Sequence, residues 1–128
     1  ASSAGCEIDI LIRGICRLRP GVPGRSERIR VRSIVGRYLE HSRIFAFGQG
    51  NTTRYFLGSA DLTPSNLDRR IQLLCPVEDA ALAARLEEIL AINLADASSG
   101  WTLGPDGVWG RVDGRSTHGD FQRLAVER

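Results

Sequence analysis

Arginine is concentrated in one stretch of the sequence. The segment LRPGVPGRSERIRVRSIVGRYLEHSR, residues 18–43, holds seven of the 17 basic residues and only two acidic ones, Glu27 and Glu40. Codon usage in a GC-rich genome explains why the chain has no lysine, but it does not explain this clustering, since residues 71–110 hold Arg85 alone. Guanidinium groups bind phosphate oxygens through two parallel hydrogen bonds. The cluster therefore predicts an anionic partner.

The spacing of apolar residues predicts a helix over residues 27–39, with Ser26 as its N-cap. The helix would arrange the basic side chains in two groups, Arg30 with Arg37 and His41 on one side, and Arg28 with Arg32. Like charges at helical spacing repel one another unless an anion neutralises them. A solvated helix face is the other interpretation, and the scarcity of acidic residues favours the anion site.

His41 stands at the end of this basic stretch. Histidine titrates near neutral pH and can donate or accept a proton during phosphoryl transfer, while guanidinium groups hold the phosphates. An exposed and inert histidine is the alternative. His118 lies in the polar C-terminal region, and the sequence predicts no role for it.

A second candidate anion site is the segment GSADLTPSNLDRR, residues 58–70. A turn of small residues at a strand end exposes backbone N–H groups and, here, the Ser59 hydroxyl. Asn66 and Asp68 could orient neighbouring side chains. An ordinary loop between strands is an equally good interpretation.

The chain of 128 residues is expected to form an α/β or α+β fold around a sheet. Hydrophobic periodicity and turn residues predict strands at residues 6–13, 43–47, 53–59 and 71–77, the last of them buried, and a helix at 79–96 capped by Asp79. They also predict a hairpin at 98–112 that turns at Pro105-Asp106-Gly107, followed by a polar tail that frays apart from a short helix at 119–127.

Other patterns exclude several classes of protein. The sequence has no apolar run long enough for a membrane span, no signal-peptide layout, no phosphate-binding glycine loop and no zinc-ligand spacing. Cys6, Cys16 and Cys75 are odd in number and well separated, so they are expected to be buried, reduced thiols. Because the sequence begins at Ala1 and has no methionine, a fragment of a longer protein is expected, with a processed chain as the alternative.

Two long segments resemble the C-terminal region of bacterial polyphosphate kinase. They are RGICRLRPGVPGRSERIRVRSIVGRYLEHSRIF, residues 13–45, and GSADLTPSNLDRRIQLLCPVEDAAL, residues 58–82. The resemblance implies a phospholipase D-like domain, the second of a facing pair, with a mixed β-sheet flanked by helices. This domain would cover residues 1–112, and residues 113–128 would be a polar tail.

The resemblance also implies an activity, which is the reversible transfer of the terminal phosphate of ATP to inorganic polyphosphate through a phosphohistidine in the other domain. The family uses Mg²⁺, bound mainly outside this segment, and the segment alone would be inactive. The implied partners are ATP, ADP, polyphosphate and the N-terminal domains of the same enzyme. A cytoplasmic homo-oligomer is expected, peripheral membrane association stays open, and no nucleic-acid partner is expected.

Four residues match positions of functional interest in this family. By resemblance, Arg13 contacts phosphate, His41 contacts ATP phosphates and acts as general acid or base, Arg70 binds phosphate, and Asp61 orients a neighbour. The chain departs from the family pattern at Arg17, Leu62 and Ser65, and the missing basic residue at Ser65 puts polyphosphate contact there in doubt.

Two other functions remain open from the residues alone. One is a non-catalytic module that binds polyphosphate or nucleic acid. The other is half of a phospholipase D-like nuclease or lipase, which usually has lysine two residues after the histidine, where this chain has Arg43.

Overall fold

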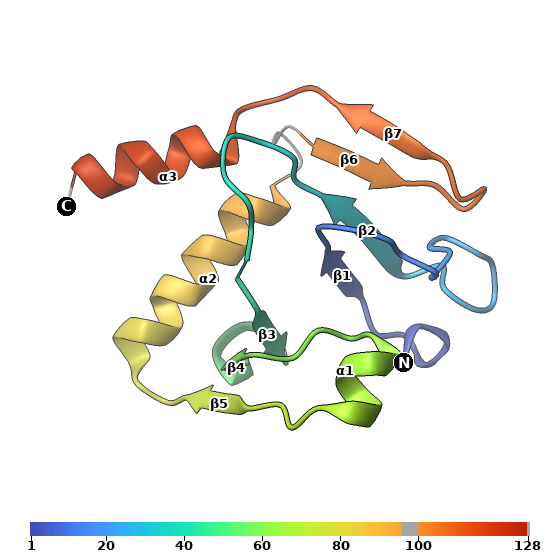
Figure 1. Cartoon of the computed structure of the whole chain (residues 1–128), viewed down its shortest axis with the longest axis horizontal. Coiled ribbons are helices and arrows are strands. Elements are labelled where there is room, and N and C mark those ends of the chain that lie inside the picture. The colour runs from blue at the N-terminus through green and yellow to red at the C-terminus, as the bar shows by residue number, and fades with distance from the viewer. Residues whose placement is uncertain (96–99, 128) are drawn as a thin grey trace. The chain divides into compact units, whose positions relative to one another are not determined.

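The computed structural model describes residues 1–95 and 100–127 (Figure 1). It contains two compact units, one formed by Ala1–Glu40 with Ala91–Arg128 and the other by His41–Leu90. The mixed α/β class expected from the sequence is confirmed. The strands form two separate sheets, a division that the sequence did not predict.

The first unit contains a four-stranded sheet in the order β1-β2-β6-β7 (Figure 1). Its strands are β1 (Ile8–Leu11), β2 (Ile29–Ser33), β6 (Gly100–Leu103) and β7 (Trp109–Val112). β1 and β2 run parallel, and the other neighbours are antiparallel, so the sheet is mixed. Val31 and Leu103 are the buried apolar side chains of its strands.

The helix predicted over residues 27–39 is wrong, because residues 29–33 form the central strand β2. In a strand, side chains alternate between two faces. Val31 and Ser33 are buried, whereas Arg30 is exposed on the opposite face. Hydrogen bonding to strands on both sides satisfies the backbone here, and β-branched residues suit such a position.

The predicted array of unpaired arginines is also wrong. Arg28 forms an ion pair with Glu7 at 2.7 Å, and Arg30 forms one with Asp9 at 2.8 Å. The guanidinium of Arg32 donates hydrogen bonds to the carbonyls of Leu94 and Ala95 at 2.6 and 3.1 Å. The parallel pairing of β1 with β2 brings Asp9 beside Arg30, and Glu7, just before β1, lies beside Arg28, so the charges of these two arginines are neutralised within the protein.

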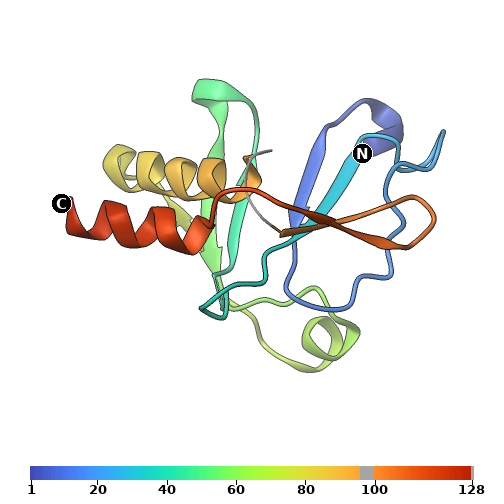
Figure 2. The ribbon, with the colours of Figure 1, turned by 90° about the horizontal axis from the view of Figure 1, so that it is seen from above.

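The predicted hairpin is confirmed over residues 100–112, while residues 98 and 99 lie outside the described part. Its turn is closed by hydrogen bonds from Gly104 N–H to the Val108 carbonyl and from Val108 N–H to Asp106 Oδ1, at 2.9 and 3.0 Å. Gly107 has a φ of 86°, which favours glycine. Figure 2 shows the sharp reversal between the two strands.

A C-terminal helix, α3 (Thr117–Val126), forms close to the predicted range of 119–127. The Ser116 side chain caps it by accepting a hydrogen bond from Gly119 N–H at 3.2 Å. Thr117 and His118 are buried, so the expectation that this part of the tail frays is wrong. The proposed domain boundary at residue 112 stays a prediction.

The second unit contains an antiparallel sheet in the order β3-β4-β5. Its elements are β3 (Ile44–Phe47), β4 (Arg54–Gly58), α1 (Pro64–Arg69), β5 (Leu74–Val77) and the start of α2 (Ala80–Leu94). A 3-10 turn, Gly50–Thr52, lies in the connection from β3 to β4. Asp79 caps α2 as predicted, since its Oδ1 accepts hydrogen bonds from Ala81 and Leu82 N–H at 3.0 and 2.9 Å. Residue 96, the predicted helix end, lies outside the described part.

Two predictions of burial are wrong. β5 is mostly exposed, and among the described residues it is an edge strand next to β4. Cys6 and Cys75 are exposed and Cys16 is half-buried, although all three are free thiols. Among residues 1–95 and 100–127, no helix is long and apolar enough to cross a bilayer.

Candidate functional site

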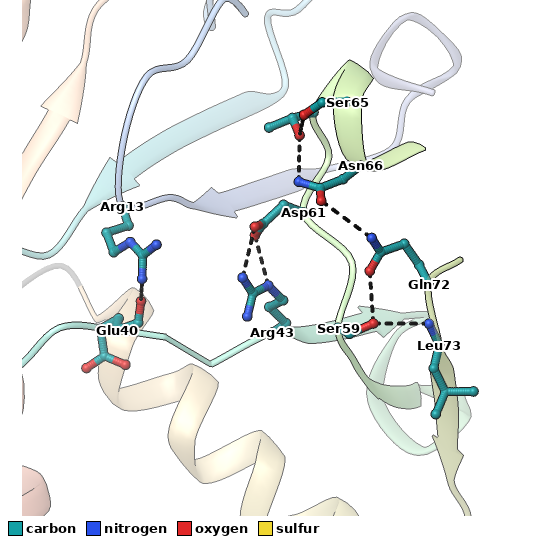
Figure 3. Close-up of polar contacts among 10 residues, drawn as sticks. Arg13, Glu40, Arg43, Ser59, Asp61, Ser65, Asn66, Gln72 and Leu73 are labelled. Carbon is teal, nitrogen blue, oxygen red and sulfur yellow. Dashed lines mark hydrogen bonds and ion pairs between the residues drawn. The ribbon is translucent and has the colours of Figure 1, made fainter. Parts of the chain in front are cut away.

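Arg13 lies just beyond the C-terminal end of β1, an edge where ligands gather in α/β sheets. A hydrogen bond from Ile12 N–H to the Arg32 carbonyl, 2.9 Å long, continues the pairing with β2 past the end of the strand. The exposed Arg13 guanidinium donates from Nη1 to the Glu40 carbonyl at 2.9 Å (Figure 3). A guanidinium has five N–H groups, so Arg13 keeps donors for a ligand while one bond fixes its direction.

His41 is the first residue of the second unit and directly follows Glu40 in the sequence. Its imidazole is exposed. Within the described part of the chain it forms no hydrogen bond or ion pair. Both ring nitrogens are therefore available to solvent and to a ligand, as general acid or base chemistry requires.

Asp61 forms a two-point contact with Arg43 (Figure 3). Arg43 Nε donates to Oδ1 at 2.8 Å and Nη2 donates to Oδ2 at 2.9 Å. The hydrogen bond to Asp61 is the main cause that raises the pKa of Arg43 above its ordinary value, and the charge of Asp61 adds to it. Asp61 thus orients the arginine that stands two residues after His41. The sequence places Arg43 two residues after His41, but no pattern in it predicts that Arg43 pairs with Asp61.

The loop that follows β4 is tied together by its own polar groups (Figure 3). The Ser59 hydroxyl donates to Gln72 Oε1 at 2.9 Å and accepts from Leu73 N–H at 3.1 Å. Asn66 Nδ2 donates to Thr63 Oγ1 at 2.7 Å. The Ser59 hydroxyl, predicted to face an anion, instead holds the loop against the segment that leads into β5.

Arg70 follows the last residue of α1, where the backbone turns extended with a φ of −129°. Its side chain is exposed, and it has no ion pair or hydrogen bond with any residue in the described ranges. This guanidinium can therefore bind an anion without breaking an existing contact.

His118, to which the sequence assigned no role, is buried in the first unit. Its Nε2 lies 2.8 Å from Glu40 Oε1, and its Nδ1 accepts a hydrogen bond from Tyr38 N–H at 3.2 Å. The first unit thus brings Arg13, Glu40 and His118 together, and the second brings Asp61 and Arg43 together. The sequence signal for His118 was the capping serine two residues before it, which marks the start of an ordered helix.

Comparison with known proteins gives consistent matches. The family described as Polyphosphate kinase C-terminal domain 2 matches residues 1–122. The polyphosphate kinase of Streptomyces coelicolor is 53% identical over 124 residues, which are 97% of this chain and 16% of that relative. The polyphosphate kinase of Thermosynechococcus vestitus is 56% identical over 109 residues, or 85% of this chain and 15% of that relative.

A solved structure agrees with these matches. The crystal structure of polyphosphate kinase from Porphyromonas gingivalis superposes with a TM-score of 0.86 at 36% identity, covering 98% of this chain and 20% of that one. The chain spans about a sixth of the length of the curated relatives named above. A family match over nearly the whole sequence, and relatives identical at half of the aligned positions, establish that the chain belongs to the polyphosphate kinase C-terminal domain family.

Proposed function

We propose that the chain forms part of the catalytic region of a polyphosphate kinase, which transfers the terminal phosphate of ATP reversibly to inorganic polyphosphate. The observation that carries this proposal is the family match over residues 1–122. In the proposed reaction, a histidine in another domain attacks the terminal phosphorus, and the bond to ADP breaks. A terminal oxygen of polyphosphate then attacks the phosphohistidine, which releases the histidine and lengthens the polymer by one phosphate.

In this proposal Arg13 and Arg70 bind phosphate groups. Both guanidinium groups are exposed, and neither is neutralised by a carboxylate within the described residues. Arg13 is already directed by its bond to the Glu40 carbonyl, so less side-chain entropy is lost when it binds a phosphate. Phosphoryl transfer depends mainly on positioning and on stabilising charge, and fixed guanidinium groups supply both.

His41 is proposed as the general acid or base. As an acid it would protonate the oxygen that leaves with ADP, and in the reverse direction it would accept that proton. The support is its exposed imidazole, which has no competing partner in the described part of the chain. Asp61 supports this region indirectly, since it orients Arg43 in the segment that follows His41.

The family resemblance implies Mg²⁺, bound mainly outside this chain. Residues 1–95 and 100–127 contain no group of three or more histidine, cysteine, aspartate or glutamate side chains able to hold a metal ion. The Asp61 carboxylate is already engaged by Arg43. No step is therefore assigned to Mg²⁺ bound by this chain. The cytoplasmic location and the oligomeric full-length enzyme are proposed from family resemblance alone.

The test uses the full-length enzyme that contains this chain. Arg13→Ala and His41→Ala should each lower kcat for polyphosphate synthesis from labelled ATP, by about 10²–10⁴-fold for the acid/base residue. Arg123→Ala is the matched control, because that arginine forms ion pairs with Asp120 on α3 and with Glu127, the residue after its end. Turnover near that of the control in either variant would refute the role assigned to that residue.

A further inference from the structure

His118, the second residue of α3, is held in a defined tautomer. A backbone N–H can only donate, so Nδ1 must accept the hydrogen bond from Tyr38 N–H without carrying a proton of its own. Nε2 therefore carries the proton in the neutral ring and donates it to the Glu40 carboxylate. Only 5% of the side chain is exposed, so both nitrogens are used inside the protein rather than in solvent.

Further contacts join α3 to the segment Gly36–Glu40. The rings of His118 and Tyr38 lie 5.3 Å apart between centroids. Gln122, one helical turn after His118 and on the same face of α3, donates from Nε2 to the Tyr38 hydroxyl at 2.6 Å. A Cβ at Gly36 would lie 2.5 Å from His118 Nδ1, so the segment approaches the imidazole as closely as glycine permits. The contacts hold the backbone at Tyr38 and the side chains of Tyr38 and Glu40.

The segment ends at Glu40, which accepts hydrogen bonds from both His118 and Arg13. Glu40 accepts from His118 through its carboxylate and from Arg13 through its carbonyl, at 2.8 and 2.9 Å. Its carbonyl belongs to the peptide bond that joins it to His41. The orientation of that peptide is therefore fixed from the side-chain end by His118 and from the carbonyl by Arg13.

We infer that His118 is a positioning residue for phosphoryl transfer: it anchors Gly36–Glu40 and so sets the direction of the Arg13 guanidinium and of the peptide that leads into His41. This inference rests on the proposed function of the chain. A histidine that served only to stabilise the fold would lower the amount of folded protein when replaced, without a selective loss of turnover. Displacement of a reacting group by about 1 Å can cost about 10²-fold in rate.

The experiment compares His118→Ala, His118→Asn and His118→Gln in the full-length enzyme. Asparagine places an acceptor near the position of Nδ1, and glutamine places a donor near the position of Nε2. Ser116→Ala is the matched control, because it removes the N-cap of α3 and leaves every contact with Gly36–Glu40 in place. For each variant, kcat and KM for ATP in polyphosphate synthesis are measured alongside the midpoint of thermal unfolding.

His118→Ala should lower kcat by about 10²-fold, with a smaller change in KM. The asparagine and glutamine variants should each recover part of that loss, and Ser116→Ala should keep the original kcat despite its lower unfolding midpoint. If the alanine variant does not fold, a selective loss of kcat in the two amide variants supports the inference. Kinetics equal to the control in folded His118 variants would overturn the positioning role alone. A full-length enzyme that makes no polyphosphate before any substitution would overturn the proposed function as well.

Discussion

Gly36→Ala tests the packing of His118 by changing a single methyl group. The new Cβ would lie 2.5 Å from His118 Nδ1 and 2.9 Å from Cε1, too close for either atom to stay in place. Gly36 is not among the glycines with a positive φ, so its backbone conformation is open to alanine. Strain from the substitution should therefore come from His118 and not from the backbone.

The expected energies follow from these two facts. Overpacking costs about 1–3 kcal/mol, and alanine recovers about 0.4–1 kcal/mol by restricting the unfolded chain. Gly36→Ala should thus lower the free energy of unfolding by on the order of 1–2 kcal/mol. In a His118→Ala background the clash is gone, so the same substitution should raise the free energy of unfolding by about 0.4–1 kcal/mol. The interaction energy of the two sites should equal the clash, about 1–3 kcal/mol.

Urea unfolding of the 128-residue chain provides the assay. The chain has two tryptophans, Trp101 and Trp109, and both lie in the sheet of the first unit. Their fluorescence therefore reports the unit that contains Gly36 and His118. The free energies of unfolding of the four proteins in the double-mutant cycle are compared, provided that the dependence of this free energy on urea concentration has the same slope in all four. A cost for Gly36→Ala that is the same in both backgrounds, within about 0.5 kcal/mol, would show that His118 does not pack on this glycine.

Two further predictions concern the arginines. In the full-length enzyme, Arg43→Lys keeps the charge but loses the two-point contact with Asp61, so kcat should fall. Asp61→Asn should lower kcat by a similar factor. The double variant should have a kcat no lower than that of either single variant. Additive losses would show that the two residues act separately. The chain should bind tripolyphosphate in calorimetry, and binding should weaken between 0.1 and 1 M salt as the Debye length shortens from about 10 to about 3 Å. Arg70→Ala should reduce that binding and the ion-paired Arg123→Ala should not; absence of heat at low salt would contradict a phosphate site.

The elements that the sequence predicted correctly depend on residues close together in the chain. Asp79 caps the helix that begins at the next residue, and the turn after β6 is built from neighbouring glycine, proline and aspartate residues. Local hydrogen bonds of this kind form wherever the rest of the chain lies. The strands β3 and β4 are likewise joined by a short connection, so their antiparallel pairing follows from proximity.

Residues 27–39 could not be assigned from local pattern, because two periodicities fit the same letters. Val31, Ile34 and Val35 suit one face of a helix, while Ile29, Val31 and Ser33 suit one face of a strand. The outcome depends on β1 and β6, and Ser33 pairs with Trp101, far along the chain. The pairing of β2 with β1 also places the Asp9 carboxylate beside Arg30, so the wrong secondary structure led to the wrong expectation that this arginine lacks an acidic partner.

The two histidines show why the sequence predicted only part of the candidate site. His41 was proposed from its neighbours and from a family motif, and its imidazole is exposed. His118 has no such motif, and its partner Glu40 lies 78 residues away in the sequence. A histidine that exchanges protons with a ligand must keep a nitrogen open, whereas one that fixes a backbone segment can use both nitrogens inside the protein. The environment of each ring thus separates the two proposed roles, and long-range contacts that no local pattern encodes determine the environment of His118.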